Sequence, residues 1–251
     1  MNSMTNHAAQ IKQFLSYCGG LPAPECASNP LGYKFSWSSR GVLLALLNSA
    51  AYTSSHQTLT IPAGGRALMA AAQPYFISPA YAFVGYPNRD STPYGVWYGI
   101  EGAETVVRGT LRYQGFCEFV RALVDMGWLD EGEKAWLVEK KAWVWREVVK
   151  VVVGAEDASE GALIARINTI CRFPSAGEAS RIVSGLRWIG MFSDEVVEVR
   201  GGNLLDTLCA RLERLMRYEE GERDLVMLQH KFVVEWADGS EVCAPPSHLK
   251  I

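Results

Sequence analysis

The sequence predicts an α+β fold, in which a mixed sheet with packing helices is joined to an all-α helical subdomain. Two patterns lead to this fold class. Residues 106–113 and 225–236 read as strands, and in the second Val226, Leu228, Phe232 and Val234 fall on one face at a two-residue period. From Phe116 onward the apolar period lengthens to about 3.6 residues, which indicates helices. Because strands lie on both sides of the helical region, we expect a helical insertion between strands of one sheet.

These patterns divide the chain into three consecutive parts. They are an α/β part at residues 11–114, an all-α insertion at 115–221, and a closing strand at 222–243 that returns to the first part. The proline pair at residues 245–246 is expected to end the last strand, because proline lacks a backbone N–H for pairing. We therefore expect residues 1–10 and 244–251 to be frayed.

Individual elements follow from local composition. We expect residues 11–16 and 81–86 to form strands, and Pro87 ends the second. Residues 42–52 are apolar almost all round, which favours a buried helix, and residues 53–66 are predicted to be a polar connection.

The helical region carries its own start signals. Ser159 can cap a helix, and Ser175 with Glu178 fits a capping box. Tryptophans at near-helical spacing usually pack in a core, and we assign that role to Trp136, Trp143 and Trp145.

Composition excludes several classes of function. The 251 residues hold 24 Lys+Arg against 27 Asp+Glu, a net charge of −3, so there is no basic field for a nucleic-acid partner. The apolar runs are too short to cross a bilayer, and residues 1–10 lack the features of a signal peptide. We expect a cytoplasmic protein with no membrane partner.

The six cysteines form no CxxC pair and none lies near a histidine at zinc-ligand spacing, so we predict no metal site. We expect free thiols, most of them small core residues. Cys18 is the exception, because it lies in residues 16–41, a turn-rich stretch that reads SYCGGLPAPECASNPLGYKFSWSSRG. We interpret this stretch as a built loop in which the glycines allow close approach of a ligand.

Five segments resemble one family, the fungal NADP-dependent, L-glutamate-forming saccharopine dehydrogenases, also called saccharopine reductases. They are the stretch above, PNRDST at 87–92, RGTLRYQGF at 108–116, LDTLC at 205–209 and ERDLVMLQHKF at 222–232. The resemblance spans residues 11–239 and implies a substrate-binding and dimerisation domain with a helical domain beside it. It further implies an oxidoreductase of lysine biosynthesis by the α-aminoadipate pathway. Glutamate and aminoadipate semialdehyde there condense to an imine, which NADPH reduces to saccharopine.

Saccharopine carries three carboxylates, and arginine binds carboxylates best because its planar fork pairs with both oxygens. From the sequence alone Arg89 and Arg112 could equally form surface ion pairs. The resemblance implies that Ser39 touches NADP, and it implies a set of substrate-binding positions: Cys18, Arg89, Thr110, Leu111 and Arg112.

Two other residues receive no catalytic role. Arg108 and Arg112 are four apart in a predicted strand and therefore share a face, but Arg108 could equally meet solvent, Glu101 or Glu104. His230 falls on an apolar face of the closing strand, and we interpret it as structural.

The sequence departs from the family pattern at both ends. It contains no strand–GxGxxG–helix motif for a dinucleotide, and its last residues lack the segment that returns to the nucleotide domain. We expect an incomplete enzyme with no complete catalytic set, able to form a homodimer or to pair with a nucleotide-binding chain. The alternatives are a non-catalytic amino-diacid-binding or dimerisation module, and a degenerate duplicate.

Overall fold

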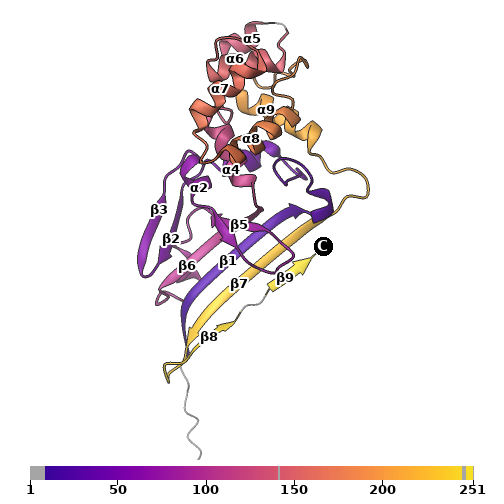
Figure 1. Ribbon diagram of the computed structural model, residues 1–251. Coiled ribbons are helices and arrows are strands. Elements are labelled where there is room, and N and C mark those ends of the chain that lie inside the picture. The colour runs from indigo at the N-terminus through magenta and orange to yellow at the C-terminus, as the bar shows by residue number, and fades with distance from the viewer. Residues whose placement is uncertain (1–8, 141, 245–246, 251) are drawn as a thin grey trace, which may run out of the picture.

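The computed structural model describes residues 9–140, 142–244 and 247–250. One mixed sheet and a group of helices at one end of it make up the architecture (Figure 1). The strands are β1 (Gln10–Pro22), β2 (Ala50–Ser54), β3 (Gln57–Ile61), β4 (Gln73–Tyr75), β5 (Phe83–Pro87), β6 (Thr105–Tyr113), β7 (Asp224–Glu235), β8 (Glu241–Ala244) and β9 (Ser247–Lys250). The predicted α+β class is confirmed.

Short helices lie between the early strands, and the longer ones follow β6. The first group comprises a 3-10 helix (Pro24–Cys26), α1 (Ser39–Ala45), α2 (Arg66–Ala70) and α3 (Tyr94–Trp97). The second comprises α4 (Phe116–Asp125), α5 (Ala135–Glu139), α6 (Trp145–Val153), α7 (Glu160–Cys171), α8 (Ala176–Trp188) and α9 (Leu204–Leu215).

Strand β1 lies at the centre of the sheet. It pairs in parallel with β6 at residues 13–18 and antiparallel with β7 from Gln10 to Pro22, so Cys18 lies opposite Thr110 on one side and Leu228 on the other. The strand order across the sheet is β3-β2-β6-β1-β7-β8. Strand β5 also pairs with β6, and β9 also pairs with β7. The closing strand therefore returns to the first part of the sheet, as the alternation at residues 225–236 predicts.

One buried apolar cluster runs from the sheet into the helices. Leu111 of β6, Phe119 of α4 and Leu163 of α7 belong to it, and each is fully buried. The predicted core role of the tryptophans is confirmed: Trp145 is buried, and Trp136 packs edge-on against Trp143 with ring centroids 5.2 Å apart.

The predicted helix caps form. The Ser159 hydroxyl accepts a hydrogen bond from the backbone N–H of Ala162, and Ser175 accepts one from Glu178. All six cysteines are free; Cys117, Cys171 and Cys209 are buried, as small core residues are. Among the described residues, no helix has both the length and the apolarity needed to cross a membrane.

The early elements differ from the sequence predictions. Strand β1 continues through Cys18 and Gly20 to Pro22, so the predicted loop begins later, because pairing with β7 outweighs the weak strand propensity of glycine. Helix α1 covers residues 39–45, and residues 50–52, predicted as helix, belong to β2.

Two predicted irregular regions are strands. The predicted connection at 53–66 contains a β-hairpin whose two turn residues, Ser55 and His56, have φ of 48° and 62°, as a type I′ turn requires. The predicted frayed end also contains a strand, because β9 pairs with β7 at residues 226–229. Residues 1–8 of the predicted frayed start lie outside the described residues.

Close backbone packing is required where the ring of Tyr17 lies across β6. A Cβ atom placed on Gly109 would lie 2.1 Å from Cε1 of Tyr17, which also stacks on Tyr75 with ring centroids 4.3 Å apart. Only glycine at position 109 leaves room for the Tyr17 ring.

We expect Gly109→Ala to lower the free energy of unfolding by roughly 1–3 kcal/mol, because the added methyl group overlaps the Tyr17 ring. Urea denaturation followed by circular dichroism measures this. Gly20→Ala is the matched control in a neighbouring strand, since its Cβ would meet nothing within 4 Å. Equal stability of the two variants would contradict the packing at Gly109.

Candidate functional site

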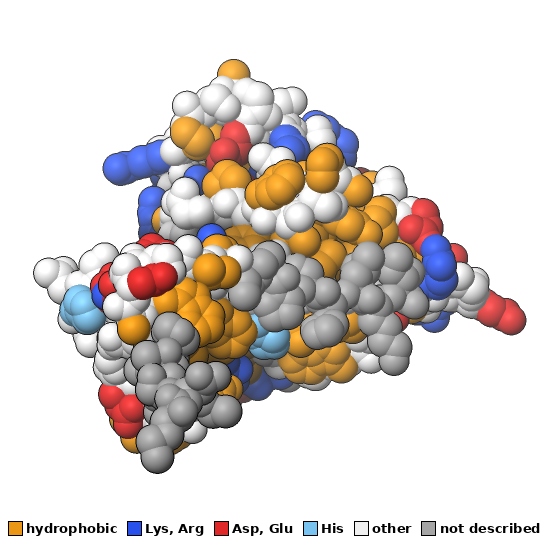
Figure 2. Space-filling model, turned by 90° about the horizontal axis from the view of Figure 1, so that it is seen from below, with side chains coloured by type: hydrophobic (Ala, Val, Ile, Leu, Met, Phe, Trp, Pro, Cys, Tyr) orange, Lys and Arg blue, Asp and Glu red, His pale blue; other side chains and the backbone are white. Residues whose placement is uncertain are grey.

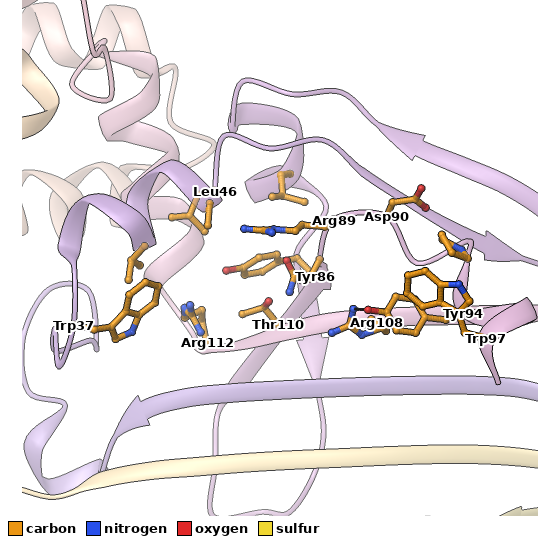
Figure 3. Close-up of a pocket in the computed structure, with 15 residues that line it drawn as sticks. Trp37, Leu46, Tyr86, Arg89, Asp90, Tyr94, Trp97, Arg108, Thr110 and Arg112 are labelled. Carbon is orange, nitrogen blue, oxygen red and sulfur yellow. Dashed lines mark hydrogen bonds between the residues drawn. The ribbon is translucent and has the colours of Figure 1, made fainter.

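A pocket of about 610 Å³ opens on one face of the sheet, between β6, the loop after β5, α1 and α3 (Figure 3). Its volume lies within the range of small-molecule sites. Side chains alternate along a strand, so Arg108, Thr110 and Arg112 of β6 all point to this face. Tyr86 of β5 lies opposite Thr110 in the sheet and adds an aromatic floor.

Arg89 reaches the pocket from the loop after β5. Hydrogen bonds hold this loop: Ala51 donates its backbone N–H to the Arg89 carbonyl at 2.9 Å, and Ser91 donates to the Ala51 carbonyl at 2.7 Å. Arg89 has φ of 54°, a left-handed conformation that is unfavourable for a residue with a Cβ atom. Strain of this kind is concentrated at functional sites, and here it directs the guanidinium across the pocket (Figure 3).

The three pocket arginines have no carboxylate partner among the described residues. The Arg112 side chain donates a hydrogen bond to the Leu111 carbonyl at 2.8 Å and lies over the Tyr33 ring. Its Nε is buried and has no hydrogen-bond partner among the described residues. Arg108 lies against Tyr94, and no ion pair or hydrogen bond within residues 9–140, 142–244 and 247–250 involves the Arg89 side chain. Arginines elsewhere are mostly paired, as Arg211 is with Glu195 and Arg66 with Asp125.

Asp90 is the one acidic residue that lines the pocket. Its Oδ1 accepts hydrogen bonds from the backbone N–H and the hydroxyl of Thr92, at 2.9 and 2.7 Å, and its carboxylate points away from Arg89 in Figure 3. The pocket is therefore positively charged. Burial raises the pKa of Tyr86 to about 12, so its phenol stays neutral and adds no negative charge at neutral pH.

The structure brings most of the predicted substrate-binding residues together. Arg89, Thr110 and Arg112 line the pocket, and Cys18, with an exposed thiol, lies beside Thr110 on the same face of the sheet. Leu111 is fully buried and faces the opposite side, so its side chain does not reach the pocket.

Ser39, the predicted NADP contact, is used inside the protein. Its side chain is fully buried in α1, and its hydroxyl donates a hydrogen bond of 2.6 Å to Glu213 of α9. The described residues also contain no cluster of potential metal ligands.

Sequence reasoning did not assign several pocket residues. Trp37, Tyr86, Tyr94 and Trp97 line it, and no motif indicated them. Arg108 lines it as well, and its four-residue spacing from Arg112 was the available signal. Glu104 was one possible partner for Arg108 in the sequence analysis. In the structure Glu104 pairs with Lys12 instead, and 2.5 Å separates Lys12 Nζ from Glu104 Oε1.

The fold and the pocket define an α+β domain with a cavity lined by three arginines. The family model for the saccharopine dehydrogenase C-terminal domain matches residues 1–249. The chain belongs to this family, as the resemblance in its sequence predicts.

Individual relatives agree with the family. The chain is 58% identical over 231 residues to saccharopine dehydrogenase [NADP(+), L-glutamate-forming] of Schizosaccharomyces pombe, covering 92% of this chain and 51% of that protein. It is 34% identical to the mitochondrial alpha-aminoadipic semialdehyde synthase of Bos taurus, of which it covers 24%. The chain spans about half the length of the fungal relatives.

A solved structure confirms the fold. Apo saccharopine dehydrogenase (L-Glu forming) from Saccharomyces cerevisiae superposes with a TM-score of 0.91 at 54% identity, and the match covers 96% of this chain and 53% of that one.

The strained backbone at position 89 leads to a stability prediction. We expect Arg89→Gly to be more stable than Arg89→Ala by roughly 1 kcal/mol, because both remove the guanidinium but only glycine adopts positive φ freely. Denaturant melts of the two variants compare them directly. A more stable Arg89→Ala variant would contradict a left-handed backbone at position 89.

Proposed function

We propose that the pocket binds saccharopine, or the glutamate and aminoadipate semialdehyde from which it forms. The observation that carries this proposal is the group of three arginines without carboxylate partners around one cavity. Unpaired guanidiniums held close together repel one another, and bound carboxylates remove that repulsion while satisfying the N–H donors. The names of the fungal relatives, which are saccharopine dehydrogenases, support this choice of ligand.

Each predicted residue then has a task. Arg89 and Arg112 form charge-assisted hydrogen bonds with carboxylates, and the Thr110 hydroxyl adds a neutral hydrogen bond. Cys18 borders the ligand beside Thr110. In this proposal, residues 11–114 and the closing strand at 222–243 form the substrate-binding part. The helical insertion at 115–221 packs against α1 and α2 through α9 and α4 and holds them in position.

We infer that the described residues do not by themselves form an NADP site. The Ser39 hydroxyl is committed to Glu213, and the sequence has no glycine-rich loop leading from a strand into a helix. We therefore assign no chemical step to this chain. We propose that it contributes substrate binding to an NADP-dependent oxidoreductase of lysine biosynthesis, with the dinucleotide held by a separate domain.

A binding module without catalysis is the second candidate. The same observations favour it, since a carboxylate pocket is present without groups for the cofactor. The two candidates differ in one experiment: the chain is mixed with the part of the S. pombe relative that it does not match, and NADPH oxidation is followed with glutamate and aminoadipate semialdehyde. Activity that needs both chains supports the enzyme component, and saccharopine binding without such activity supports the module.

We expect Arg89→Met and Arg112→Met each to weaken saccharopine binding by roughly 10- to 100-fold, because each removes charge-assisted hydrogen bonds worth about 1.5–3 kcal/mol. Isothermal titration calorimetry on the 251-residue chain measures the change. Arg217→Met is the matched control, since Arg217 is an exposed arginine outside the pocket with no ion pair among the described residues. Equal weakening in all three variants would contradict the proposal.

A further inference from the structure

Arg108 lies at the opposite end of the pocket from Arg112. Both belong to β6 and point to the same face, four residues apart, which at about 3.3 Å per residue separates their Cα atoms by roughly 13 Å. In Figure 3 Thr110 lies between them, and Arg89 extends above Tyr86 and Thr110 with its guanidinium pointing toward the Arg112 end. The pocket therefore has positive charge at both ends.

Neighbouring groups hold the Arg108 side chain in place without neutralising it. Its Nη1 donates a hydrogen bond to the Tyr94 hydroxyl, and its Cζ lies 4.2 Å from the centroid of the Tyr94 ring. Its backbone N–H donates to Ser91 Oγ at 3.0 Å. Tyr94 is itself fixed by edge-on packing against Trp97, with centroids 4.8 Å apart. The Tyr94 contact occupies one N–H of the fork, and the remaining donors have no partner among the described residues.

We infer that Arg108, positioned by Tyr94, is a second anion subsite that selects long ligands with carboxylates at both ends over short ones. The inference rests on the proposed binding of carboxylates in this pocket and extends it to ligand length. A short diacid such as glutamate has its carboxylates too close together to engage both ends. A long polycarboxylate such as saccharopine can place one carboxylate near Arg89 and Arg112 and another near Arg108.

The experiment compares linear dicarboxylates of increasing length. The dissociation constants of the full chain for glutarate, pimelate, azelate and undecanedioate are measured by calorimetry, together with those for saccharopine and glutamate. For the unsubstituted chain we expect affinity to rise by roughly tenfold or more once the diacid is long enough to reach Arg108. In Arg108→Met that rise disappears, so affinity for the long diacids falls by roughly tenfold more than affinity for glutarate, and circular dichroism of the variant serves as the test of folding.

Two further variants sharpen the comparison. Arg108→Lys keeps the charge but not the planar fork, so we expect it to retain part of the preference for long diacids. Arg89→Met is expected to weaken glutarate and the long diacids alike.

The inference is overturned if Arg108→Met retains the preference for long diacids, or if it weakens short and long diacids equally. The first outcome leaves the proposed function intact, provided that Arg89→Met still weakens binding. Failure of the unsubstituted chain to bind any of these carboxylates overturns both the proposed function and this inference.

Discussion

The pairing of β1 with β6 on one side and β7 on the other is the constraint on which the molecule depends. It joins the first strand of the chain to strands on both sides of the helical insertion. The register that it sets places Cys18 beside Thr110 and aligns the alternate residues of β6 on one face. The loop after β5 also bonds to β6, because the backbone N–H of Asn88 donates a hydrogen bond to the Arg108 carbonyl. This bond holds Arg89 close to the face of β6 that lines the pocket. The pocket is thus a product of strand register.

The electrostatics of the pocket stand apart from those of the rest of the chain. In the helical part, Arg211 has a nearly buried guanidinium that is paired with Glu195 and bonded to the Ile189 carbonyl. The nearly buried charge of Arg211 is therefore compensated within the protein by a partner and a hydrogen bond. Arg89 instead combines an unpaired charge with an unfavourable backbone conformation. Departures from local rules of this kind are concentrated at functional sites, where the surrounding structure holds them in place.

Much of the architecture could be predicted from local pattern. The strand patterns at 106–113 and 225–236, the caps at Ser159 and Ser175, and the apolar helix faces are short-range signals, and each corresponds to an observed element. The early region was less predictable. Gly19 and Gly20 favour a turn locally, yet they lie in a strand because neighbours distant in sequence pair with it. The hairpin at 50–61 has its turn at Ser55 and His56, which rarely adopt positive φ, so its signal was weak.

Prediction of the site was uneven for a related reason. The resemblance identified Arg89, Thr110 and Arg112, but residues such as Tyr94 and Trp37 reach the pocket through tertiary packing that no motif reports. Leu111 shows the opposite case, because a contiguous run of three residues in a strand necessarily directs its middle side chain to the other face.

The central position of β1 also governs the order in which the protein can fold. Its partner β7 follows the whole helical insertion in the sequence, so one edge of β1 stays unpaired until that insertion has been made. Contacts between segments so distant in sequence form slowly, because the loop between them loses much conformational entropy on closure. The helices make local contacts and can form early, whereas the sheet, and the pocket on its face, are completed only after β7 has been made.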